Sequence, residues 1–234
     1  MPESNFNPYQ SPPIPEDSNL PPGHDPRLRP VATGLKLIHS GILLSLVACI
    51  VGFPSTALTG GTNLITFLMR ILLIVGVVLI QIGPLFCVAV PVGLGLRPSA
   101  IATIILQSAF LGLVVFQLAY WRAFPWYAIG SGIFAFFASA AFLIFMFRTL
   151  QYMRRSDLLK RTRNVCFIGL GVLAGTLAVT FLVETDDPGV AGLIAMVTCG
   201  FSYLVLFVAY ANLVNAIAYA IRNPEKNSKQ VGLA

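Results

Sequence analysis

Residues 64–90, "LITFLMRILLIVGVVLIQIGPLFCVAV", decide the class of fold. This stretch carries a single charged residue, Arg70. It is also longer than the about 20 apolar residues that a helix needs to cross a hydrocarbon core about 30 Å thick. The chain of 234 residues is 56% hydrophobic and only 10% charged, with a mean hydropathy of +0.81. Soluble domains carry roughly 25% charged residues. We therefore predict an all-α integral membrane protein.

The pattern of apolar stretches predicts a bundle of six transmembrane helices within residues 31–222. The second stretch exceeds one perpendicular crossing and contains Pro84 and Pro91, so we expect one tilted, kinked helix rather than two spans. The six predicted spans are Leu35–Phe53, Leu64–Val92, Ser99–Trp121, Trp126–Leu150, Asn164–Glu184 and Val190–Ile221.

The two ends of the chain are polar. Residues 1–30 hold nine of the sixteen prolines and no apolar run, which predicts a disordered, partly polyproline tail. This segment lacks the basic start and apolar core of a signal peptide, so we expect the first apolar run to be a membrane span. Residues 223–234 are predicted to form a short second tail.

The basic residues predict the orientation. If the N-terminus is cytoplasmic, thirteen of the fifteen Lys and Arg residues fall on the cytoplasmic side, and only Arg70 and Arg122 lie outside. The positive-inside rule then places both termini in the cytoplasm. Because loop placement accounts for the net charge of +6, we expect no nucleic-acid partner.

The loop between the fourth and fifth predicted spans is the most basic segment. Each Lys or Arg close to anionic lipid contributes about 1 kcal/mol to membrane binding. We therefore interpret this loop as a lipid-contacting, orientation-fixing segment, and the alternative is a docking site for a cytoplasmic protein. The candidate anionic-lipid contacts are Arg148, Arg154, Arg155, Lys160, Arg161 and Arg163.

Small residues at four-residue spacing predict which spans approach closely, since helix association in lipid needs close packing. The last three spans carry such rows, whereas the first offers only Gly41 and Ser45, so we expect a compact bundle in which spans four to six approach closely. The alternative is that a row mediates homodimers. The rows are Ser131, Ala135 and Ser139; Gly171 and Gly175; and Ala191, Ala195 and Cys199.

Polar side chains inside the spans are the candidate intramembrane contacts. Arg70 either extends to the outer headgroups or pairs with Glu184 or Gln117. At matching depth Gln81 is predicted to face Gln107. Such an amide contact adds about 0.6 kcal/mol to helix association. Helix association is the favoured role, and a substrate site is the alternative.

The proline in the second span is a second intramembrane feature. Pro84 removes a backbone donor and frees the carbonyl of Ile80. A neighbouring helix satisfies such a carbonyl in most cases, and the alternative is that it lines a cavity.

Residues that carry reaction chemistry are sparse. Histidine occurs only at positions 24 and 39, so no base is available in the later spans to activate a serine. The four cysteines lie in four different apolar stretches, without a CxxC pair or a Cys/His cluster. We predict no catalytic residue, no cofactor and no metal site.

The N-terminal "NPYQSP" and the later "GLKLIHSGILL" and "LFCVAVPVGLGLRPSA" resemble uncharacterised multi-span membrane proteins of planctomycete-type bacterial genomes. Cys87, Val90 and Pro91 match the pattern, whereas "VGLGL" replaces the acidic loop residue of that group. The resemblance covers about the first 110 residues. It implies a bacterial inner membrane and no known activity.

The sequence therefore predicts a non-catalytic, multi-pass inner-membrane protein with a structural, scaffolding or regulatory role. Its expected partners are membrane lipids, with a second copy or another protein as further possibilities. The alternative is a small-solute transporter or channel subunit, with a path near Gln81, Pro84 and Gln107.

Overall fold

The computed structural model describes residues 28–59, 63–90, 95–120, 125–183 and 189–223. Over these ranges the chain forms helices and no strand, which confirms the predicted all-α class. Most of residues 1–30 and of residues 223–234, the two predicted tails, lie outside the described residues. The helices are α1 (Arg29–Thr59), α2 (Leu64–Cys87), α3 (Arg97–Tyr120), α4 (Pro125–Tyr152), α5 (Ser156–Val183) and α6 (Gly189–Arg222).

Four of the described segments are long and apolar enough to cross a membrane. They are Arg29–Gly52, Leu64–Cys87, Ile133–Tyr152 and Gly200–Arg222. Arg97–Leu113 in α3 is a shorter apolar segment. The chain is therefore a helical protein with the length and hydropathy of a membrane-spanning bundle.

Helix α2 is shorter than predicted and ends at Cys87 instead of Val92. The Val88 and Ala89 amides donate to Leu85 O and Phe86 O in a tightened final turn. Pro91 opposes a longer helix, because it has no amide proton to donate to Cys87 O and disfavours the helical conformation of Val90. Pro84 consequently sits in the last turn of the helix rather than at a mid-span kink.

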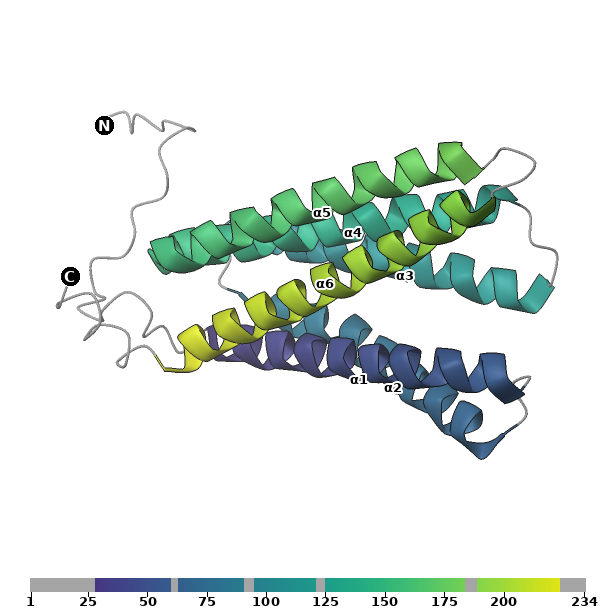
Figure 1. Ribbon diagram of the computed structural model, residues 1–234. Coiled ribbons are helices and arrows are strands. Elements are labelled where there is room, and N and C mark those ends of the chain that lie inside the picture. The colour runs from purple at the N-terminus through teal and green to yellow at the C-terminus, as the bar shows by residue number, and fades with distance from the viewer. Residues whose placement is uncertain (1–27, 60–62, 91–94, 121–124, 184–188, 224–234) are drawn as a thin grey trace, which may run out of the picture.

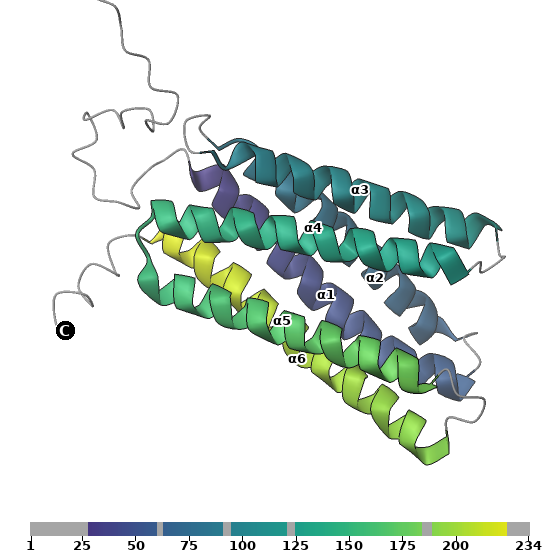
Figure 2. The ribbon, with the colours of Figure 1, turned by 90° about the horizontal axis from the view of Figure 1, so that it is seen from above.

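Each helix packs on the helix that follows it in the chain, and α6 also packs on α1. Figures 1 and 2 show α3, α4 and α5 on one side of the bundle and α1 and α2 on the other, with α6 crossing obliquely. The start of α1, the end of α2, the start of α3, the α4–α5 turn and the end of α6 lie at one end (Figure 1). We call this the basic end. Among the described Lys and Arg residues, only Arg70 lies at the opposite end of the bundle.

The buried core lies toward the basic end and draws on all six helices. The rings of Phe142 and Phe145 stack 5.8 Å apart within it. Toward the opposite end, large apolar side chains such as Leu64 and Phe201 are 70% and 66% exposed. The largest fully buried residues at the basic end are Leu28, Val31, Leu35, Val90, Leu96, Phe142, Phe145, Met146, Leu150, Val214 and Ile217.

The closest helix contact lies between α1 and α2, along a glycine seam made of Gly34 and Gly41 on α1 and Gly76 and Gly83 on α2. A Cβ atom added to Gly41 would lie 2.5 Å from Gly76 O, and one added to Gly34 would collide with Gly83 O. The two glycines on each helix are seven residues apart, the repeat of a left-handed helix pair. Absent side chains therefore let the two backbones touch.

The prediction that small-residue rows bring spans four to six close together was wrong for the GxxxG row of α5. Gly171 and Gly175 are exposed, and a Cβ atom added to either would meet no atom of the described residues within 4 Å. Of the other predicted rows, the Ser139 hydroxyl donates to Ala135 O within α4. The side chains at 131, 191, 195 and 199 lie outside the described residues.

Candidate functional site

Two of the basic-end arginines are held by backbone carbonyls near the α2–α3 connection. The Nη1 group of Arg148, on α4, donates to Gly95 O at 3.0 Å. Arg97 Nε, at the start of α3, donates to Val88 O at 3.3 Å. The Arg97 bond closes the last turn of α2. The Arg148 bond ties α4 to the segment just before α3. Arg148, a predicted lipid contact, therefore has a bond inside the protein.

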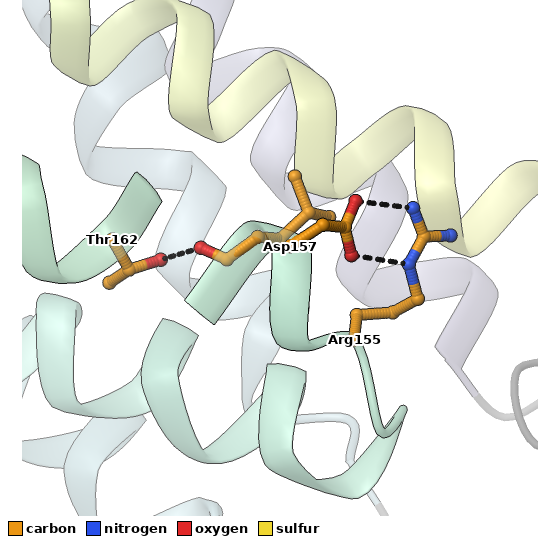
Figure 3. A network of polar contacts seen from close by, with 4 residues as sticks. Arg155, Asp157 and Thr162 are labelled. Carbon is orange, nitrogen blue, oxygen red and sulfur yellow. Dashed lines mark hydrogen bonds and ion pairs between the residues drawn. The ribbon is translucent and has the colours of Figure 1, made fainter. Parts of the chain in front are cut away.

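A third arginine is held by an acid in the turn between α4 and α5 (Figure 3). Arg155 Nε and Nη2 donate to the two carboxylate oxygens of Asp157 at 3.0 and 2.9 Å. This bond lowers the pKa of Asp157 and raises that of Arg155. An ionised acid in the first turn of α5 also suits the positive end of the helix dipole. The pair therefore neutralises Asp157 and begins the helix.

The turn itself is tight, and Arg154 adopts the left-handed conformation with φ of 54°. The Arg155 amide donates to Leu150 O and the Arg154 amide to Gln151 O, so the carbonyls at the end of α4 are satisfied. This bonding pattern favours glycine at position 154. An arginine stands there at a conformational cost.

The remaining candidate lipid contacts are exposed. Among the residues that the structure describes, the only ion pair is Arg155–Asp157. Lys160, Arg161 and Arg163 occupy the first two turns of α5, and with Arg154 they carry positive charge that no described acid balances. The six predicted contacts thus divide into two engaged arginines and four cations that have no acidic partner among the described residues.

The structure brings two of the intramembrane polar residues together. Gln81 Nε2, on α2, lies 3.4 Å from the backbone oxygen of Gln107 on α3, at the long end of hydrogen bonding. The Gln107 side-chain oxygen Oε1 is buried and has no hydrogen-bond partner among the described residues. The contact therefore uses the backbone carbonyl of Gln107, and the side-chain amide of Gln107 takes no part in it.

The other predicted intramembrane contacts are not brought together over the described ranges. Arg70 is exposed on α2, away from the basic end. Glu184 and the side chain of Gln117 lie outside the described residues.

Sequence reasoning missed the contact that His39 makes. Its Nδ1 atom lies 3.0 Å from Ala211 O and joins α1 to α6. A carbonyl oxygen only accepts, so Nδ1 carries the proton and donates. The available signal was the spacing of His39 from Leu35 and Ile42, which are buried and share its helix face.

No three His, Cys, Asp or Glu side chains gather into a possible metal site within the described ranges. A comparison with models of protein families, with curated proteins and with solved structures finds no match.

Proposed function

We propose that the chain is a six-span, non-catalytic protein of the bacterial inner membrane with a structural, scaffolding or regulatory role. In this proposal α3 and α5 also cross the membrane, and the basic end faces the cytoplasm. Membrane lipids and a protein docked at the basic end are the partners.

One observation carries this proposal: a single buried cluster at the basic end includes residues of all six helices. Leu35 of α1, Ala100 of α3, Phe145 of α4 and Val214 of α6 are almost fully buried in it. Interiors packed in this way deform little. The start of α1 and the end of α6 are therefore held at a fixed spacing, which suits a platform that presents its two tails to a partner.

A second candidate, a small-solute transporter or channel subunit, is favoured by one specific observation. The Oε1 atom of Gln107 is buried without a hydrogen-bond partner in the described part of the chain, next to Gln81. A buried polar atom left unpaired costs about 1–3 kcal/mol, and a bound solute would offset that cost.

Cysteine accessibility separates the two candidates. In a chain without its native cysteines, Gln107→Cys is treated with a membrane-impermeant thiol reagent on inverted vesicles. The structural role predicts protection, with Arg154→Cys as the positive control because Arg154 is exposed. Modification at position 107 supports the transport role instead.

The scaffolding role has its own test in cells. A tagged full-length chain is expected to cross-link to discrete partners. Deletion of residues 1–26 is expected to remove these products without loss of membrane insertion if the tail is the contact. A chain that cross-links to nothing in its own membrane contradicts the role.

A further inference from the structure

We propose that the outer face of α5 binds one anionic phospholipid, with the headgroup at Lys160, Arg161 and Arg163 and an acyl chain along Gly171 and Gly175. This inference rests on the proposed placement of α5 in the membrane. It identifies which of the cations at the basic end form a lipid site.

The charge at the start of α5 favours an anion. Asp157 is the only described acid in this region, and Arg155 already neutralises it through two hydrogen bonds. Lys160, Arg161 and Arg163 follow within two turns and are exposed, and no described acid pairs with them. A phosphate group at this level would meet three uncompensated positive charges.

Lys160 and the glycines share one side of the helix, and Arg161 and Arg163 flank that row on its two sides. Lys160, Asn164, Gly171 and Gly175 are separated by four, seven and four residues, and all four are exposed. At 1.5 Å per residue, Gly171 and Gly175 lie about 16 and 22 Å along the axis from Lys160. One leaflet of hydrocarbon is about 15 Å thick, half the core. The row therefore has the length of one phospholipid molecule.

The lower part of the row has room for a chain. A Cβ atom added to Gly171 or Gly175 would meet no atom of the described side chains and backbone within 4 Å. Beside them Phe167 and Leu170 project outward, with 64% and 55% of their surfaces exposed. The glycines thus form a side-chain-free strip with long apolar side chains beside it, directly below the cations.

The same charges disfavour a second copy as the occupant. A symmetric dimer within one membrane has its two-fold axis along the membrane normal, so its two α5 helices run parallel. Contact through Gly171 and Gly175 would then bring the three cations of one copy against those of the other. Like charges at an interface oppose association, whereas a lipid phosphate neutralises them.

Tryptophan quenching by brominated lipids tests the site. Phe167→Trp serves as the reporter in a full-length chain in which Trp121 and Trp126 are replaced by Phe. Two vesicle preparations are compared, both made mainly of phosphatidylcholine. In one, the brominated lipid is phosphatidylglycerol; in the other, it is phosphatidylcholine. Bromine is on the acyl chains in both. We expect phosphatidylglycerol to be preferred by about fivefold or more, since one engaged cation contributes about 1 kcal/mol.

Ile105→Trp on α3 is the matched control reporter. Ile105 is 62% exposed and lies eight residues from Arg97, whose guanidinium is engaged with Val88 O. There the two lipids are expected to quench equally. Lys160→Gln, Arg161→Gln and Arg163→Gln together should reduce the preference at position 167 to that of the control.

Filling the glycine strip tests the acyl-chain part. Gly171→Leu with Gly175→Leu is expected to lower the phosphatidylglycerol preference at position 167 at least twofold. Gly112→Leu on α3, another glycine with no atom within 4 Å of an added Cβ, should leave it unchanged.

Four outcomes overturn the proposal. Equal quenching by both lipids at position 167, or a preference that survives the triple Gln variant, removes the headgroup site. Disulfide cross-linking between copies through Gly171→Cys, in a chain without its native cysteines, assigns the face to a second copy. Quenching by neither lipid also removes α5 from the membrane, and so contradicts the proposed function itself.

Discussion

At Gly41 the backbones of α1 and α2 touch, and the position leaves no room for a methyl group. An added Cβ would lie 2.5 Å from Gly76 O and 2.8 Å from the Ile80 side chain. Gly41→Ala is therefore expected to lower the free energy of unfolding by about 1–3 kcal/mol, the usual cost of overpacking. Thermal unfolding in mild detergent measures this change.

Gly112→Ala is the control for that substitution. Gly112 is exposed on α3 with no atom within 4 Å of an added Cβ. Alanine favours a helix over glycine by up to about 1 kcal/mol, so the unfolding temperature should stay or rise. Equal losses at positions 41 and 112 would contradict the glycine seam.

Arg154 offers a second test at the scale of one residue. Its φ of 54° places a side chain in the left-handed region, which costs an L-residue about 1–2 kcal/mol. Arg154→Gly removes this cost and is expected to raise the free energy of unfolding by up to about 1 kcal/mol. Arg154→Ala keeps the Cβ atom and should bring no such gain. If alanine stabilises as much as glycine, the cause is the lost charge rather than the backbone.

At the scale of elements, the contact between α2 and α3 predicts unequal effects of two similar substitutions. Gln81→Leu removes the donor to Gln107 O and should weaken the bundle by about 0.6 kcal/mol. Gln107→Leu leaves that backbone acceptor in place and removes the unpaired Oε1, so stability should be unchanged or higher. Chemical unfolding of both variants in detergent measures the difference. A larger loss for Gln107→Leu would indicate a role for its amide group.

The turn between α4 and α5 predicts a dependence on pH. The hydrogen bonds from Arg155 lower the pKa of Asp157 below its ordinary 3.8. The stabilisation is therefore present above about pH 4 and is lost as pH falls through the lowered value. The pair is partly exposed, so its worth is less than about 1 kcal/mol. Asp157→Asn should be less stable than the native chain near pH 7, and the gap should close as the pH falls below the lowered pKa of Asp157. A gap that persists in acid would contradict this origin.

The helices themselves could be predicted, because a long apolar run in a membrane protein has few alternatives to a helix. Their ends could not be predicted from hydropathy alone. Helix α5 begins at Ser156, eight residues before the predicted Asn164, because its first two turns are basic. Polar helix turns carry no hydropathy signal.

Sequence reasoning could not predict which helices pack on each other, or which cations have partners, because both depend on residues that only the fold brings together. Gly34 and Gly41 are seven residues apart, and their role appears only when α2 brings Gly76 and Gly83 opposite them. In the same way, a basic loop predicts lipid contact for every cation in it. Only the fold separates Arg148 and Arg155, which have partners, from Lys160 and Arg161.

For the whole molecule, the accumulation of cations at the basic end predicts its orientation. Ser156→Cys, in a chain without its native cysteines, should react with an impermeant maleimide in inverted vesicles and not in intact cells. Leu64→Cys, exposed at the opposite end, should show the reverse. Modification of position 156 from outside intact cells would contradict the positive-inside assignment.

The contact between α1 and α6 has a consequence for biosynthesis. Helices α1 and α2 can pair through their glycines as soon as both have left the ribosome. The acceptor of the His39 hydrogen bond, Ala211 O, is synthesised 172 residues later. Until then the face of α1 that packs on α6 has no partner. Every chain that ends before α6 therefore leaves this face of α1 uncovered. A membrane quality-control protease that recognises unpaired helices would therefore degrade truncated chains and spare the closed ring.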